Sequence, residues 1–254
     1  MKNNRSDRTP TLRPLFSMCE QLESRTLMYS ATVGVNAGTT FQTMDGFGAG
    51  MMTWTSPSEY SNAAFYDRIA NDLGATIART AIWPTFEKGN DNNDPNTFNW
   101  AGYDKNALGQ AMTFLKRLQD RGMSQFLATV WTPPAWMKTN QSHFYGGTVR
   151  PDLRDEFAEY LAATAISAKR DFGVNLSHIS PQNEPFFVQD YESAAYTDVQ
   201  MREVVRSAMR KFTAEGLGTQ LIAPEEMAKG ERFDWYADAI MNDPETRNFP
   251  GAWG

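Results

Sequence analysis

The most informative stretch of the sequence is Ile179-Ser180-Pro181-Gln182-Asn183-Glu184-Pro185. It follows Val174-Asn175-Leu176-Ser177-His178, a short apolar and β-branched pattern that suits a buried strand. Asn183 and Glu184 are therefore expected where that strand ends. Because Pro185 has no N–H and a fixed φ, it cannot continue a central strand and should bias Glu184 toward extended backbone.

This arrangement presents an amide and a carboxylate together at a strand end. In a parallel barrel the carboxyl ends of the strands form the active face, so Glu184 is a candidate proton donor. An Asn-Glu-Pro tripeptide also occurs at ordinary strand-to-turn junctions, where it has no chemical role. The surrounding sequence has to decide between these two interpretations.

Strands and helices alternate along the whole chain, which predicts an α/β protein with a parallel sheet covered by helices. Five strands are expected, counting the one that carries Glu184. The other four strands are expected within residues 41–50, 75–82, 125–130 and 219–223. Helices are expected over residues 56–73, 104–121, 152–172, 197–215 and 233–241.

Composition narrows the possible partners. The chain has 254 residues, 41% of them hydrophobic, which is enough for a sizeable core. A net charge of −6 argues against nucleic acid, which is usually met by clustered positive charge. Aromatic residues make up 13% of the chain, and flat rings stack well on the apolar faces of sugars. A neutral carbohydrate fits these numbers better than a charged polymer.

Metal ions, cofactors and a membrane span are not expected. Cys19 is the single cysteine, and His143 and His178 lie far apart with no ligand-type spacing, so the site prediction contains no metal. No apolar run approaches the roughly 18 residues that a membrane-spanning helix needs. The sequence does not indicate an oligomeric state.

Two further strand ends bring polar and aromatic side chains to the same face. Arg79 lies in the otherwise apolar strand 75–82, where a guanidinium is costly unless a carboxylate or ligand meets it, so we expect it to point into the site. Trp131 follows the strand 125–130 and precedes two prolines that fix a rigid loop, so it is a candidate sugar platform, although ordinary packing is the alternative. Trp54 is a further candidate substrate-binding residue.

Glycines at 46, 48 and 50 have the spacing GxGxG. A dinucleotide loop needs GxGxxG between a strand and a helix, so a nucleotide-dependent oxidoreductase is disfavoured. Glycines at the end of a first strand more plausibly allow close approach of the backbone to a ligand or a neighbouring strand.

Taken in order, these segments resemble family 30 of the glycoside hydrolases, which are (β/α)8 TIM-barrel enzymes. The resemblance is carried by 42–48 (Gln-Thr-Met-Asp-Gly-Phe-Gly), 131–140 and 180–185, with support from 191–193 and 223–227, and it covers the chain from about residue 31 onward. It implies a retaining enzyme that acts on β-linked glycosides such as xylan, β-glucan or glucosylceramide-like substrates. It also implies that Glu184 is the acid/base and that Asn183 binds the sugar 2-OH.

The same resemblance implies that Trp131 lines the sugar subsite and that Arg79 helps to hold the nucleophile. In such barrels the nucleophile comes from the seventh strand, and only five strands are expected here. We therefore expect a barrel truncated after about five βα units, of uncertain activity by itself. Glu225 and Glu226, which close the fifth strand, are weak substitutes, since adjacent acids at a strand end more often bind substrate or solvent.

The first 30 residues are expected to be a separate leader, and residues 31–254 the partial barrel domain. The segment 20–28 resembles the LEPR-type amino-terminal segment of exported proteins of planctomycete-like bacteria, but it has Ser24 where that pattern has Pro and Met28 where it has Leu. An extracellular or cell-surface location follows as an expectation. A plain basic leader without an address is the alternative, and a noncatalytic carbohydrate-binding or surface protein is the alternative function.

Overall fold

The computed structural model describes residues 32–34, 36–52, 58–227, 230–248 and 251–253. The chain divides into two units, Met1–Thr43 and Met44–Gly254, and all that follows concerns the second. The predicted leader over residues 1–30 lies outside the described residues, as does Trp54. The leader, its boundary and the extracellular location therefore stay predictions.

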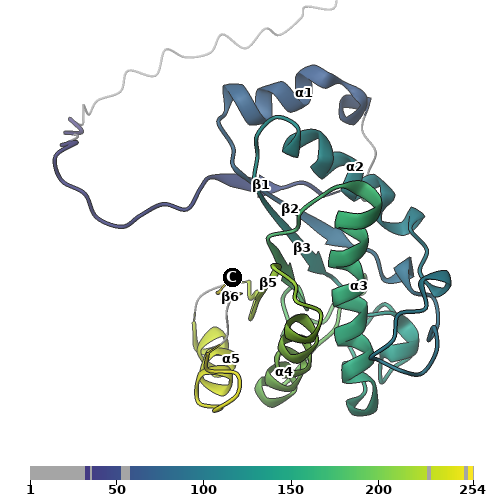
Figure 1. Cartoon of the computed structure of the whole chain (residues 1–254). Coiled ribbons are helices and arrows are strands. Elements are labelled where there is room, and N and C mark those ends of the chain that lie inside the picture. The colour runs from purple at the N-terminus through teal and green to yellow at the C-terminus, as the bar shows by residue number, and fades with distance from the viewer. Residues whose placement is uncertain (1–31, 35, 53–57, 228–229, 249–250, 254) are drawn as a thin grey trace, which may run out of the picture. The chain divides into compact units, whose positions relative to one another are not determined.

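Six parallel strands form one sheet, and their order in space is their order in the sequence (Figure 1). Each strand is joined to the next through a crossover, which is the connectivity of a (β/α) barrel. The fold class predicted from the sequence is confirmed. The strands are β1 Gly48–Gly50, β2 Ile77–Ile82, β3 Gln125–Val130, β4 His178–Ser180, β5 Gln220–Ile222 and β6 Gly251–Ala252.

Along the chain the helices alternate with the strands, and in space α3 packs against both α2 and α4. Short 3-10 turns cover Ser58–Ser61, Pro84–Phe86, Trp100–Gly102, Ala135–Met137 and Pro151–Leu153. The α-helices are α1 Ala63–Asp67, which continues as a π-helix over Arg68–Asp72, α2 Asn106–Gln119, α3 Arg154–Phe172, α4 Asp198–Ala214 and α5 Glu231–Met241.

Local signals set the ends of the long helices. Thr197 caps α4: its side chain accepts from the Gln200 N–H, and the Gln200 side chain accepts from the Thr197 N–H. α3 ends at Gly173, whose φ of 67° is left-handed and therefore favours glycine. Both ends agree with the sequence prediction.

Alternation along β2 separates the core from the candidate site. Ala78 joins the hydrophobic core with residues of β3 such as Phe126, and Ile82, at the end of β2, belongs to the core and also borders the cavity. Arg79 and Ala81 point to the opposite face and line a cavity. Because successive side chains of a strand point to opposite faces, one strand serves both the core and the site.

Three details of the fold differ from the prediction. A sixth strand, β6, is present, and its two residues carry no apolar pattern that the sequence alone would reveal. Over its described residues, the helix expected at 56–73 is a 3-10 turn followed by α1 and a π-helix, and Asn62 caps α1. β4 starts at His178, later than expected, although Val174 and Leu176 are buried in the core.

The sheet is open, since β1 and β6 each pair with one neighbour among the strands that the structure describes. No helix within the described ranges has the length and apolar character that crossing a bilayer requires.

Candidate active site

The Asn183-Glu184 pair is held between the ends of β3 and β5. The Asn183 N–H donates to the Val130 carbonyl at 2.8 Å, and the Glu184 N–H donates to the Glu225 carbonyl at 2.8 Å. Backbone pairing thus continues past the end of β4 on both sides. It fixes the two side chains at the carboxyl end of the sheet, as predicted.

The backbone of Glu184 is left-handed, with φ of 45°, so the expected extended geometry is wrong. Pro185 disfavours the right-handed helical region for Glu184, but the turn that follows requires a sharp reversal. The Glu184 carbonyl accepts from the Phe187 N–H at 2.9 Å, and its own N–H is bound to Glu225. These two bonds offset a conformational cost of about 1 kcal/mol for a non-glycine residue.

Arg79 connects three strand ends through its guanidinium. Its Nε donates to Glu225 Oε1 at 2.5 Å, and its Nη2 donates to Asn183 Oδ1 at 2.6 Å. The guanidinium carbon also lies 4.6 Å from the centre of the Trp131 ring, in a cation–π contact. Of the two partners expected for Arg79, a carboxylate or a ligand, the structure shows a carboxylate, and Arg79 lines a cavity. Its substrate-binding role stays a prediction.

Glu225 is more strongly held than the sequence indicated. Besides Arg79, Thr129 Oγ1 lies 3.4 Å from Glu225 Oε1, while the other carboxylate oxygen is buried without a partner. By sequence alone, Glu225 is an acid at a strand end that binds substrate or solvent. Its ion pair with Arg79, 146 positions away in the chain, is the contact that sequence reasoning missed.

Glu184 itself lies in a cavity of about 530 Å³. Burial raises the pKa of its carboxyl group, and the charges of Glu226 and Glu225 add to this, while Arg79 acts in the opposite direction. A higher pKa keeps a larger fraction of the carboxyl group protonated near neutral pH. The cavity is lined by Arg79, Ala81, Ile82, Trp83, Pro84, Trp131, Asn183, Glu184, Tyr191 and Glu192.

Four of the five predicted site residues therefore meet in one cavity, and the fifth, Trp54, lies outside the described residues. Trp83, Tyr191 and Glu192 complete the wall. Tyr191 and Glu192 fall in a segment that the resemblance had singled out, but Trp83 was missed. Its position directly after β2 was the available signal.

Lys138 secures the loop that carries Trp131. This lysine is fully buried, and its Nζ donates to Thr132 Oγ1 at 2.9 Å and to the Ser193 carbonyl at 2.7 Å. Burial lowers its pKa to about 8. The lysine thus ties the Trp-Thr-Pro-Pro loop to the segment that carries Tyr191 and Glu192.

The glycines near β1 serve close packing. A Cβ built on Gly48 would lie 1.9 Å from the Ile77 carbonyl oxygen, and one on Gly46 would lie 2.2 Å from Thr76 Oγ1. Neither position tolerates a side chain without movement of the neighbouring backbone or side chain. The interpretation of these glycines as close-approach residues is confirmed.

Comparisons with known proteins agree with this geometry. The sequence model of the family described as O-Glycosyl hydrolase family 30 matches residues 89–241, more than half of the chain. A Caenorhabditis elegans protein that bears the name glucosylceramidase 3 is 26% identical over 149 residues, which are 54% of this chain and 28% of that protein.

Solved structures give the same result. The family 30 subfamily 8 xylanase Xyn30A of Clostridium acetobutylicum is 27% identical with a TM-score of 0.69, over 87% of this chain and 51% of that one. A family 30 endoxylanase of Clostridium papyrosolvens is 26% identical with a TM-score of 0.62, over 83% of this chain and 49% of that one. The chain thus spans about half the length of these enzymes. On its sequence match and its fold together, the chain belongs to family 30 of the O-glycosyl hydrolases.

Proposed function

We propose that Glu184 is the acid/base of a retaining hydrolysis of β-linked glycosides. The observation that supports this most directly is the position of Glu184 in the 530 Å³ cavity, beside an amide and an indole, where burial and neighbouring carboxylates raise its pKa. A general acid needs its proton at the working pH and must reach the leaving oxygen. The raised pKa of Glu184 favours the first requirement, and its position on the cavity wall supports the second.

In the proposed reaction, Glu184 gives its proton to the glycosidic oxygen as the bond from that oxygen to the anomeric carbon breaks. A second carboxylate attacks the anomeric carbon from the opposite face and forms a glycosyl-enzyme ester. Water then displaces this ester while Glu184, now ionised, takes the water proton. The proton and the carboxylate are thereby restored at the end of the cycle.

Asn183 has the orientation that sugar binding requires. Its Oδ1 accepts from Arg79, so the amide is turned with its NH₂ group free to donate to a sugar hydroxyl, for which we propose the 2-OH. Trp131 has Arg79 against one face of its ring, so a sugar would meet the other face or the edge. These contacts support substrate-binding roles for all three residues.

Glu225 is better suited to positioning than to attack, because Arg79 and Thr129 occupy Oε1. We propose that it holds Arg79 and assign the nucleophile to no residue of this chain. As substrate we propose a β-linked polysaccharide, with xylan as the first choice. The names of the two xylanases that are more than 25% identical support this choice.

The test supplies the missing attacking group from solution. Azide is a small anion that can take the nucleophile's place and attack the anomeric carbon while Glu184 protonates the leaving oxygen. With phenyl and dinitrophenyl β-xylosides, the chain should form α-xylosyl azide from both. Glu184→Gln should slow the phenyl substrate at least about 100-fold but barely affect the dinitrophenyl substrate, whose leaving group needs no proton.

Glu231→Gln provides the matched control, because Glu231 is an exposed carboxylate in the first turn of α5. This variant should keep the rate of the parent chain with both substrates. Turnover of the phenyl substrate that survives Glu184→Gln would overturn the assignment. Binding of xylo-oligosaccharides without product from either substrate, with or without azide, would favour the noncatalytic carbohydrate-binding alternative.

A further inference from the structure

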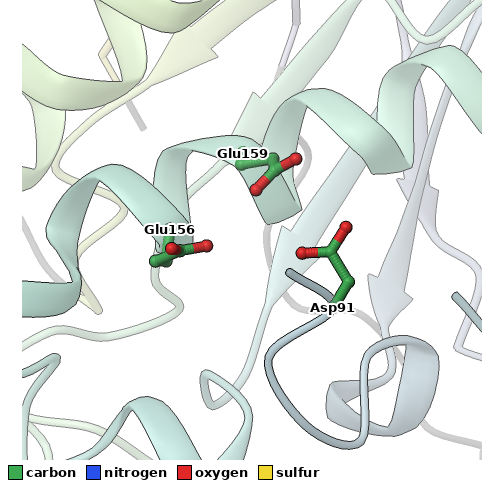
Figure 2. Close-up of side chains that lie close together, drawn as sticks. All are labelled: Asp91, Glu156 and Glu159. Atoms are coloured by element: carbon green, nitrogen blue, oxygen red, sulfur yellow. The ribbon is translucent and has the colours of Figure 1, made fainter. Parts of the chain in front are cut away.

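A second group of acids lies behind the cavity wall, between the β2–α2 loop and α3. Glu156 and Glu159 are three residues apart on α3 and so share one face of the helix. Figure 2 shows both carboxylates together with Asp91 of the facing loop. One oxygen from each of these three residues can be chosen so that all lie within 4.8 Å of one another.

Glu87 provides an independent sign that this space holds a ligand. Its side chain is 1% exposed, and neither carboxylate oxygen makes a hydrogen bond of ordinary geometry. It lies within electrostatic range of Asp91, Glu159 and Glu156. The hydroxyl of Tyr103, which pairs with Glu87 in an antiparallel bridge, is also buried without a partner. Two buried oxygen-bearing side chains next to the acids thus lack the contacts that buried polar groups require.

Positive side chains do not balance these four acids. The ion pairs of the described residues include none of Glu87, Asp91, Glu156 and Glu159. Lys211 acts on Glu159 through its charge, yet its Nζ is 2.8 Å from Glu215 and lies over the Phe98 ring. A single shared ammonium does not balance four acids, of which Glu87, Glu156 and Glu159 are buried and Asp91 is half-buried. Acids in such a place either hold a proton or bind a metal.

We propose that Asp91, Glu156 and Glu159 bind a hard divalent cation beside Glu87, and that this cation is Ca²⁺. Oxygen-only ligands are typical of Ca²⁺ and Mg²⁺. Ca²⁺ accepts six to eight oxygens in flexible geometry, whereas Mg²⁺ demands a near-ideal octahedron and keeps several waters. Carboxylates that come from a loop and a helix therefore suit Ca²⁺ better.

The loop is built to bring Asp91 to α3. Asp91 Oδ2 accepts from the Asn99 N–H at 2.7 Å, which leaves the buried Oδ1 without a partner. Gly102 allows the close approach, because a Cβ there would lie 2.5 Å from the Asp91 Cβ. The loop and the helix thus present oxygens from opposite sides to one point, as a cation site requires.

The cation would brace the wall of the Glu184 cavity without touching substrate. The Glu87 carbonyl accepts from Trp136 Nε1 at 3.2 Å, and Trp83 and Pro84, just before Glu87 in the chain, line the cavity. The role inferred here is structural, and it holds whether or not Glu184 is the acid/base.

The first experiment measures the melting temperature of the chelator-treated chain with CaCl₂, MgCl₂ or MnCl₂, against NaCl of equal ionic strength. Ca²⁺ at about 100 times its Kd should raise Tm by about 5–10 °C. Glu159→Gln and Asp91→Asn should lose this rise. Asp155→Asn should keep the Tm rise, because Asp155 is an exposed carboxylate that shares the first turn of α3 with Glu156.

A second measurement does not depend on stability. Equilibrium dialysis should give about one Ca²⁺ per chain, and Tb³⁺ placed in the site should show luminescence sensitised by the nearby Trp136 and Tyr103. Absence of bound Ca²⁺, an effect no larger than that of NaCl, or an equal Tm rise in the parent chain and Glu159→Gln would each overturn the proposal. A low Tm of a variant would not by itself support the Ca²⁺ site, because the amount of Ca²⁺ bound by the parent chain in dialysis decides whether the site exists.

Discussion

The cavity of Glu184 and the acidic cluster behind it are two ways to bury carboxylates in one barrel. At the cavity, Glu225 is paired with Arg79 and Asn183 accepts from the same guanidinium, so the charge is compensated within the chain. In the cluster of Glu87, Asp91, Glu156 and Glu159, most of the buried oxygens have no partner. The first arrangement contains its own cation, although one Glu225 oxygen has no partner, whereas the second needs protons or a cation from outside.

The difference separates two uses of a buried acid. A paired carboxylate such as Glu225 fixes neighbouring groups in position for chemistry. A group of unpaired buried acids needs protons or a bound cation to offset its charge. Three substitutions test this contrast.

Arg79→Met should have the largest effect. It leaves Glu225 without its cation and frees the Asn183 amide to rotate, and loss of one partner of a buried pair costs about 3–5 kcal/mol. Because the two side chains are 23% and 15% exposed, we expect about 2–4 kcal/mol in the free energy of unfolding, measured with urea. Arg150→Ala, which breaks an exposed pair with Asp152, should change it by less than about 0.5 kcal/mol. Equal effects of the two variants would contradict the compensated-charge interpretation.

Lys138 tests a buried cation that has only neutral partners. Its pKa is about 8 in the folded chain and about 10.5 when unfolded, so between these values the unfolded state binds more protons. Stability should therefore rise with pH over this window, by about 1–3 kcal/mol, when the parent chain is compared with Lys138→Met. Urea unfolding at pH 7.5, 9 and 10.5 measures this difference. A difference that stays flat with pH would show that Lys138 keeps its proton in the fold.

Glu159→Gln should give the smallest effect and the opposite sign to Arg79→Met. In cation-free buffer at pH 7.5 it removes one carboxylate from a group of four, so the free energy of unfolding should rise by about 1 kcal/mol. Asp155→Asn on the same helix should change it by less than about 0.5 kcal/mol. Destabilisation by Glu159→Gln without added cation would mean that the cluster is already satisfied within the chain.

The sequence predicts much of the fold because its signals are local. Gly173 and the Thr197–Gln200 box fix helix ends through backbone conformation and side-chain bonds within a few residues. β6 could not be found in this way, since Gly251 and Ala252 have no periodicity and are defined by pairing with β5. The left-handed Glu184 also escaped prediction, because it depends on a bond to Glu225 on another strand.

For the candidate site, residue types could be predicted but not partners. An arginine in a buried strand must meet an acceptor, which identified Arg79, but the choice of Glu225 depends on the order of strands in space. The acidic cluster is harder still. Glu87 and Asp91 lie in a polar stretch that indicates a solvated loop, and their burial arises only when α3 packs on that loop.

One hydrogen bond connects the acidic cluster to the wall of the Glu184 cavity. Tyr160, next to Glu159 on α3, donates from its hydroxyl to the Trp83 carbonyl at 2.9 Å, so the helix that carries two of the acids also holds the backbone of a residue that lines the cavity. If occupation of one region changes affinity at the other, linkage requires the effect to be mutual and equal in factor. A saccharide titration at low and high calcium, paired with a calcium titration with and without saccharide, would give that single coupling constant twice.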